Sequence, residues 1–115
     1  MAISSDFSKE KRLLNSADFS RVFEQVEIKY ATKHYLCLAR HNRVKQARLG
    51  LVISKKHIKT AVNRNRIKRI VRDGFRNHQH KLNNLDIIFI SRCHLGMMEN
   101  MKIHQSLANV WQKFS

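Results

Sequence analysis

The sequence is poor in the residues that build tight turns and phosphate-binding loops. Its 115 residues include no proline and only three glycines, Gly50, Gly74 and Gly96. These glycines stand far apart, so the chain has no glycine-rich loop of the Walker or Rossmann type. This absence excludes the nucleotide-dependent enzymes that need such a loop.

Long apolar runs are missing as well. No run approaches the roughly 18 to 20 apolar residues that span a bilayer. The first residues, MAISSDFSKEKRLL, lack the apolar segment of a signal peptide. The chain is therefore expected to be cytoplasmic and not to insert into a membrane.

Cysteine and metal-ligand patterns are equally sparse. Cys37 and Cys93 both fall in apolar, strand-like runs, with no second cysteine or histidine at ligand spacing. Both are expected to be reduced and buried in the core. His78 and His80 would point to different sides of a helix, and the other histidines are scattered, so we expect no metal site in the protein.

Acidic residues are few, which leaves a large positive charge. The chain has 23 Lys and Arg against 8 Asp and Glu, a formal net charge of +15. With 43% hydrophobic residues it can still form a core, and its length fits one domain over residues 1–115. Such a charge favours nucleic acid or an anionic membrane surface as partner over an acidic protein.

Apolar periodicity predicts elements in the order α-β-β-α-β-α, with a further short strand near Tyr30 left open. Residues 1–11 are polar and expected to be loose. Ser16 would cap a first helix over ADFSRVFEQV, because apolar residues recur there at helical spacing. The runs YATKHYLCLAR (30–40) and RLGLVIS (48–54) are typical of strands.

The second half of the chain predicts a parallel strand pair. Thr60 would cap a long helix that ends near His80, and LDIIFIS (85–91), apolar on both faces, would be a central strand. Two strands joined through a helix predict an α/β sandwich. Asn100 would cap a last helix whose apolar stripe includes Trp111; Phe75 and Trp111 are predicted in the core, with Met97, Met98 and Met101 filling gaps.

Positive charge is concentrated on the long helix. Ten Lys and Arg residues and one acid, Asp73, lie between positions 54 and 81, which gives +9. Helical projection sets cations opposite the apolar stripe of Ile67, Ile70, Val71 and Phe75. Like charges four residues apart cost a few tenths of a kcal/mol per pair, so a face of one sign indicates phosphate binding rather than mere solvation. Asn65, Arg69, Arg72 and Arg76 lie on this face, with Arg64 and Lys68 on one shoulder and Arg66 on the other.

The segment AVNRNRIKRIVR, residues 61–72, resembles the RNR signature of the protein subunit of bacterial ribonuclease P. That ribonucleoprotein removes 5′ leaders from precursor tRNAs. Further segments are similar to the family in the same order: RLLNSADFSRVF (12–23), RLGLVISKK (48–56), LDIIFISR (85–92) and the closing helix. An arginine-rich helix flanked by four matching segments is far more specific than a basic helix alone.

The resemblance implies an α/β two-layer sandwich with a mixed central sheet and a left-handed βαβ crossover, against the general right-handed preference. It also implies that the RNA subunit is the catalyst and holds most of the Mg²⁺, while the protein carries no catalytic residue and helps to bind substrate and metal. Asp18, Asp73 and Asp86 fall on separate elements, which agrees with the absence of a two-metal carboxylate cluster.

The resemblance further implies two partners, the catalytic RNA and precursor tRNA, with no small-molecule substrate and a monomeric free protein. The RNR helix is expected to bind the catalytic RNA, with Arg64 and Asn65 nearer the substrate path. The residues assigned to this surface are Arg64, Asn65, Arg66, Lys68, Arg69, Arg72 and Arg76.

A second surface is implied for the single-stranded leader, in a cleft between the first helix and the sheet. Aromatic rings stack on bases without reading sequence, and nearby cations follow the backbone. Spacing alone would place the phenylalanines of the first helix in the core; the resemblance favours Phe19 in the cleft and leaves Phe23 open between cleft and core. One departure is Leu38, where some relatives carry a further aromatic residue. The residues assigned to the leader are Phe19, Phe23, Tyr35, Lys55, Lys56 and Arg64.

Two other functions fit parts of the pattern. A small basic ribosomal protein would share the size and charge but would not explain the similarity from Arg12 onward. A sequence-specific DNA-binding protein fits less well, because the long helix has its apolar stripe committed to a sheet and lacks a helix-turn-helix partner.

Overall fold

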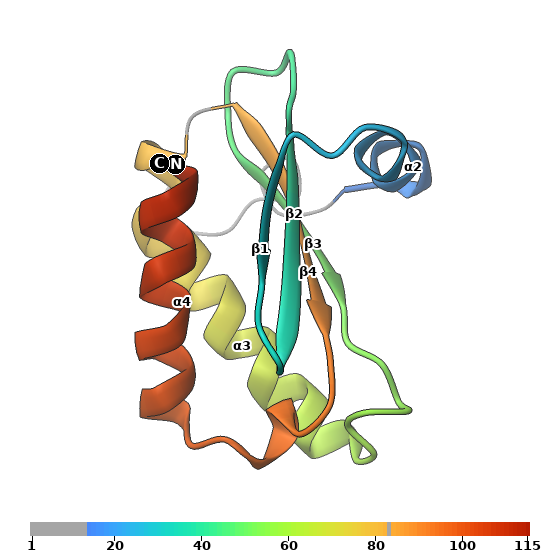
Figure 1. Ribbon diagram of the computed structural model, residues 1–115, viewed down its shortest axis with the longest axis vertical. Coiled ribbons are helices and arrows are strands. Elements are labelled where there is room, and N and C mark those ends of the chain that lie inside the picture. The colour runs from blue at the N-terminus through green and yellow to red at the C-terminus, as the bar shows by residue number, and fades with distance from the viewer. Residues whose placement is uncertain (1–13, 83) are drawn as a thin grey trace, which may run out of the picture.

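The computed structural model describes residues 14–82 and 84–115, which form a four-stranded mixed sheet between helices (Figure 1). The α/β sandwich predicted from the sequence is confirmed, whereas the expectation for residues 1–11 lies outside the described residues. In chain order the elements are α2 (Ser16–Glu24), β1 (Ile28–Ala31), β2 (Tyr35–His41), β3 (Arg48–Val52), α3 (Ala61–His78), η1 (Gln79–Lys81), β4 (Leu85–Ser91), η2 (Leu95–Met97) and α4 (Asn100–Phe114).

The strands are ordered β1-β2-β4-β3 across the sheet. β1 and β4 both pair with β2 in antiparallel fashion, and β3 pairs with β4 in parallel. The central position of β4 and its parallel pairing with β3 through α3 confirm two predictions. The handedness of that crossover stays a prediction of the family resemblance.

The strand expected over residues 30–40 is divided into β1 and β2. The turn between them is held by the hydroxyl of Thr32, which accepts hydrogen bonds from the backbone N–H groups of His34 (3.1 Å) and Tyr35 (3.0 Å). The short extra strand near Tyr30 is therefore present, as β1.

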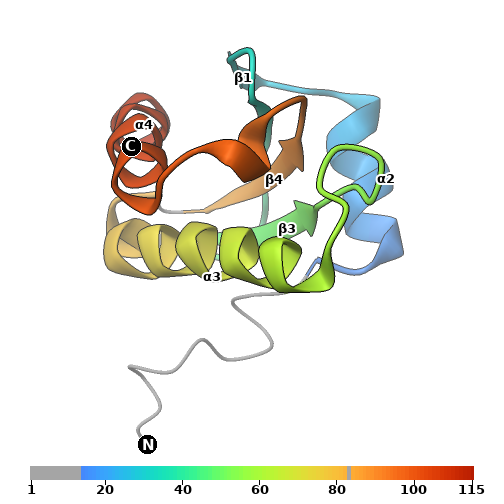
Figure 2. The same cartoon turned by 90° about the horizontal axis from the view of Figure 1, so that it is seen from below.

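The helices cover the two faces of the sheet unequally. α3 and α4 lie on one face and enclose the main core, which includes Phe75, Phe89 and Trp111 (Figures 1 and 2). α2 lies on the opposite face over a smaller cluster of Leu14, Val22, Leu38 and Ile88. We call this second side the α2 face of the sheet.

Side-chain caps explain where the helices begin. Thr60 caps α3 as predicted, accepting from the N–H of Asn63 at 3.2 Å. α2 is capped by Asn15 rather than Ser16: the Asn15 side chain accepts from the Asp18 N–H at 2.9 Å, and the Asp18 carboxylate accepts from the Asn15 N–H, which completes a capping box. Asn100 does not cap α4: it is the first helical residue, and Glu99 precedes it without a side-chain bond.

Two expectations about burial are wrong. Cys37 is buried, and burial raises the pKa of its thiol, but Cys93 is exposed because β4 ends at Ser91 and Cys93 lies in the following turn. Met98 packs against the core, whereas Met97 and Met101 are 82% and 66% exposed. Among residues 14–82 and 84–115, no helix is both long and apolar enough to cross a membrane.

Candidate nucleic-acid interface

The outer side of α3 carries a row of cations. Its inner side packs Ile67, Ile70, Val71 and Phe75 into the core, as the periodicity predicts. Lys68 and Arg69 form no hydrogen bond or ion pair within the described chain, and Arg76 has only an exposed contact of 3.4 Å with Asp73. We call Lys68, Arg69, Arg72 and Arg76 the cation row.

The arginines at the start of α3 lie differently from that row. Arg64 Nη1 donates to the carbonyl oxygens of Ile58 (2.9 Å) and Lys59 (3.0 Å), in the loop before the helix. Arg66 donates to residues that follow β4. Asn65, between them, is exposed. The structure thus separates the arginines that the sequence placed on one RNA-binding surface.

An ion-pair network fixes α2 on the sheet. Arg48 forms a two-pronged contact with Asp86, from Nε to Oδ1 at 2.8 Å and from Nη2 to Oδ2 at 2.9 Å, and reaches Asp18 of α2 at 3.4 Å. The hydrogen bond to Asp86 raises the pKa of the Arg48 guanidinium above its ordinary value. Asn42 donates a further bond to Asp86 at 2.7 Å. Opposite charges at paired positions on β3 and β4 were the sequence signal that could have revealed this contact.

This anchoring sets the positions of the two phenylalanines of α2. Phe19 is half-buried against Gly50, while Phe23 is 50% exposed. Their rings stack with centroids 6.4 Å apart and an interplanar angle of 23°. Phe23 therefore faces solvent rather than the core, and the pair presents an aromatic surface at the border of the α2 face.

Tyr35 does not belong to this surface, so its expected place in the cleft is wrong. It is 1% exposed and lies in the main core on the opposite side of the sheet, stacked on Phe89 at 5.1 Å. Its hydroxyl is 2.6 Å from Ser106 Oγ of α4, and burial raises its pKa to about 12. Alternate strand residues face opposite sides, so Leu36 and Leu38 of β2 are the ones on the α2 face.

Part of the α2 face is apolar and incompletely covered. Leu36 pairs with Ile90, which pairs in turn with Val52, and all three keep some exposure. Leu36 and Ile90 pack against the same small cluster as Phe19. Val52 is two residues from Gly50 and so shares its side of the sheet. The alternation of Leu36 and Ile90 with core positions along their strands is the sequence signal that could have revealed this surface.

Lys55 and Lys56 follow β3 and are exposed, as expected. The loop is tied to the sheet at Ser54, whose N–H donates to Ser91 Oγ at 2.9 Å, and the Lys56 N–H donates to Ser54 Oγ at 3.0 Å. Because β3 and β4 run in parallel, Arg92 leaves the sheet at the same end. Three cations thus lie beyond the carboxyl ends of these two strands.

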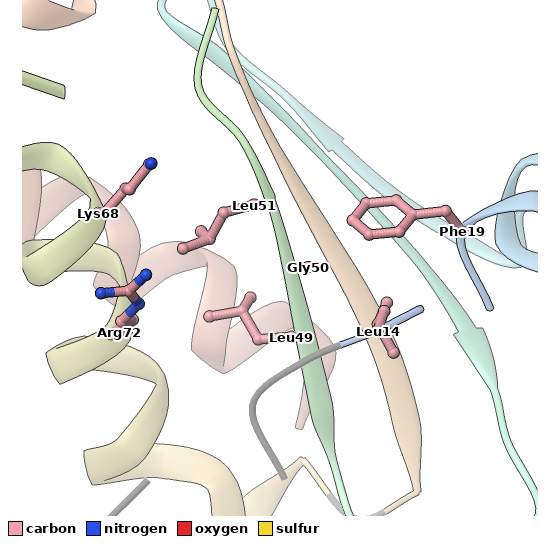
Figure 3. A pocket seen from close by; sticks show the side chains of 7 residues that line it. All are labelled: Leu14, Phe19, Leu49, Gly50, Leu51, Lys68 and Arg72. Atoms are coloured by element: carbon pink, nitrogen blue, oxygen red, sulfur yellow. The ribbon is translucent and has the colours of Figure 1, made fainter. Parts of the chain in front are cut away.

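A cavity of about 160 Å³ opens beside β3, the edge strand of the sheet that the described residues form (Figure 3). Phe19 and Leu14 lie on one side of the strand, and Lys68 and Arg72 approach from α3 on the other. Arg72 Nε is buried and has no hydrogen-bond partner among the described residues. The cavity therefore joins the aromatic border of the α2 face to the cation row.

The carboxylates among residues 14–82 and 84–115 do not fit a magnesium site. Mg²⁺ prefers several oxygen ligands with nearly octahedral geometry, but Asp18 and Asp86 are engaged by Arg48, and Glu27 is paired with His41. No group of three or more His, Cys, Asp or Glu residues that could hold a metal occurs in the part of the chain described here.

These features define a small, basic α/β sandwich with an arginine-rich crossover helix and an adjoining aromatic surface. Comparison with known proteins identifies a family with these features. The family model described as Ribonuclease P matches residues 7–115. A protein of Pseudomonas paraeruginosa named ribonuclease P protein component is 46% identical over 111 residues, covering 96% of this chain and 82% of that protein. One of Pseudomonas putida is 46% identical over 113 residues, covering 98% and 84%.

Solved structures agree. The RNase P protein of Staphylococcus aureus superposes with a TM-score of 0.80 and 32% identity, covering 88% of this chain and 92% of that one. The RNase P protein of Thermotoga maritima superposes with a TM-score of 0.76 and 26% sequence identity, covering 91% of this chain and 98% of that one. The chain therefore belongs to the ribonuclease P protein family.

Proposed function

We propose that this chain is the protein subunit of ribonuclease P, which binds the catalytic RNA and the single-stranded 5′ leader of precursor tRNA. It would assist the Mg²⁺-dependent cleavage that releases the leader, while the RNA subunit carries the chemistry. The observation that carries the proposal is the cation row on α3, joined through the cavity beside β3 to the partly exposed aromatic pair of α2, in a chain of this family.

The cation row is the proposed docking surface for the catalytic RNA. A helix of 18 residues is about 27 Å long, so its cations can reach several successive phosphates. Arginine favours two-pronged contact with phosphate oxygens. Lys68, Arg69 and Arg72 are not neutralised by any acid in the described chain, so their charge is available to an external polyanion. Asn65, exposed at the start of the helix, would lie beside them.

The leader would lie on the uncovered part of the α2 face. Phe23 and the edge of Phe19 offer stacking surfaces, and Leu36, Ile90 and Val52 add apolar contact. Lys55 and Lys56 would follow the phosphates. None of these contacts selects a base, which suits a subunit whose substrates carry many leader sequences.

Magnesium would be held mainly by the RNA. The acids of the described chain are largely committed to arginine and histidine partners, so the protein's part is to bind and orient the two RNAs. Its positive charge would also lower the repulsion between them, which reduces the need for free Mg²⁺.

Reconstitution tests the proposal. The protein mixed with a bacterial ribonuclease P RNA at low magnesium should strongly stimulate cleavage of a precursor tRNA, and the protein alone should not cleave. Lack of stimulation over the RNA alone would overturn the assignment. Binding of the protein to a DNA duplex of the same length as the precursor tRNA is the matched control, since it measures binding driven by charge alone.

A further inference from the structure

Arg66, although part of the R-N-R motif, directs its guanidinium into the protein. Nε donates to Asn63 Oδ1 at 2.9 Å, and Nη2 donates to the Gly96 carbonyl at 2.9 Å. Nη1 donates to the Met98 carbonyl at 3.2 Å and to Asn100 Oδ1. Four of the five N–H donors of an arginine are thus used within the chain.

This arrangement leaves little of Arg66 for RNA. Two-pronged phosphate binding needs two parallel N–H groups, and Arg66 has a single N–H left. Arg69, one turn further along α3, has all of its donors free within the described residues. The two arginines therefore occupy opposite situations on the same helix.

Apart from Asn63, the residues that accept hydrogen bonds from Arg66 belong to one region of the chain. They lie in the connection between β4 and α4, residues 92–99, and in the first residue of α4. Asn63 holds the same region, since its Nδ2 donates to the Gly96 carbonyl at 2.9 Å. Gly96 permits this approach, because a Cβ there would lie 2.8 Å from Asn63 Nδ2.

We infer that Arg66 is a positioning residue that fastens the β4–α4 connection to the start of α3, and that the cation row makes the phosphate contacts. The inference deepens the proposed function and rests on it. Arg64 holds the loop before α3 in a similar way through the carbonyls of Ile58 and Lys59. Arg64 and Arg66 would thus hold the start of α3, where Asn65 is exposed. The cation row on the following turns of α3 would bind the RNA.

Replacing an arginine with lysine distinguishes a phosphate contact from a positioning residue, because the substitution keeps the charge but not the hydrogen-bond geometry. Lysine keeps the charge of arginine but has one ammonium group in place of the planar fork, so Arg66→Lys cannot reach Asn63, Gly96 and Asn100 together. Arg69→Lys, in contrast, keeps what a phosphate needs. The variants are therefore Arg66→Lys and Arg66→Ala, with Arg69→Lys and Arg69→Ala as matched controls.

The first measurement is affinity for the catalytic RNA as a function of salt, at a temperature where circular dichroism shows each variant folded. Each phosphate contact contributes about 0.7 to 0.9 to the slope of log affinity against log salt. Arg69→Ala should lower the slope by about one such contact, and Arg69→Lys should restore it. Both Arg66 variants should bind about tenfold more weakly with the wild-type slope.

The second measurement needs no RNA. The N–H groups of Met97 and Met98 donate within the connection, to His94 and Leu95. Their hydrogen exchange should accelerate in Arg66→Lys but not in Arg69→Lys. Unchanged exchange would overturn the fastening role even if Arg66→Ala fails to fold.

Other outcomes are equally decisive. A reduced slope in Arg66→Ala that Arg66→Lys restores would make Arg66 a phosphate contact and overturn the inference. Wild-type affinity in both folded Arg66 variants would show that the connection does not matter for RNA binding, which also overturns it. If the wild-type protein does not bind the catalytic RNA at all, the proposed function fails, while the exchange result still decides the fastening role.

Discussion

Gly50 of β3 lies directly under the ring of Phe19: a Cβ built on Gly50 would be 2.5 Å from Phe19 Cζ and 2.9 Å from Cε1. No real side chain tolerates such a distance, so any residue larger than glycine must displace the ring. Because Phe19 stacks on Phe23, the position of the aromatic pair depends on this one missing methyl group.

Gly50→Ala should therefore weaken binding of precursor tRNA with a long leader more than that of one with a one-nucleotide leader. It should also lower the free energy of unfolding by about 1 to 3 kcal/mol through overpacking. Fluorescence titrations with the two substrates and urea denaturation measure both effects. Gly74→Ala is the control, since its Cβ would meet Trp111 at 2.9 Å in the main core, away from Phe19; equal losses for both leaders in Gly50→Ala would contradict the leader assignment.

Phe23→Ala should separate binding from stability. The ring is half exposed, so its removal should change the free energy of unfolding by less than about 1 kcal/mol. Loss of one stacking surface should weaken long-leader binding by about 1 to 3 kcal/mol. Val26→Ala, an exposed aliphatic change beyond the end of α2, should leave leader binding unchanged. A similar loss in both variants would show that stacking is not the cause.

Asp86→Asn should be strongly destabilising. It leaves the largely buried guanidinium of Arg48 without its two-pronged partner, and breaking such a pair costs about 3 to 5 kcal/mol. Asp73→Asn, which removes the exposed contact with Arg76, should cost less than about 1 kcal/mol. Urea denaturation of the two variants checks the difference, and comparable values would mean that the network does not anchor α2.

The raised pKa of Tyr35 predicts a loss of stability at high pH. The folded protein keeps the phenol protonated to about pH 12, whereas in the unfolded chain it ionises near pH 10. Unfolding then releases a proton in this window. The contribution is thus complete below about pH 10 and is lost as the pH rises through 12. In Tyr30→Phe, where Tyr35 is the remaining tyrosine, the tyrosinate absorbance should appear near pH 12; a midpoint near 10 in the folded state would contradict the burial argument.

The parts of the fold that follow from local pattern could be predicted. The stripe of Ile67, Ile70, Val71 and Phe75 defines α3, and the apolar run of β4 places that strand in the centre of the sheet. The composition of β2 does not determine which of its side chains face α2, because shifting a strand by one residue exchanges its faces. The resemblance implies Tyr35 in the cleft, but the structure places Tyr35 in the main core and Leu36 on the α2 face.

Prediction of the candidate site from the sequence fails for a different physical reason. Helical projection gives the direction of each arginine from the helix axis but not the carbonyl groups of distant segments. Arg66 meets the Gly96 carbonyl across 30 positions of sequence, and nothing in the motif itself indicates that contact. The expected burial of Cys93 and Met97 is wrong for another reason: both residues lie beyond the end of β4 at Ser91, and the apolar run does not show where the strand ends.

The outer edge of β3, which pairs with no further strand among residues 14–82 and 84–115, also bears on how the protein behaves before it meets RNA. An unpaired strand edge can extend its sheet with a second copy, and natural proteins commonly guard such edges with charge. Here Lys68 and Arg72 border the cavity along that edge, so two copies brought edge to edge would oppose like charges. The side chains that we propose contact RNA would then also discourage self-association, and raising the salt concentration would weaken both effects together.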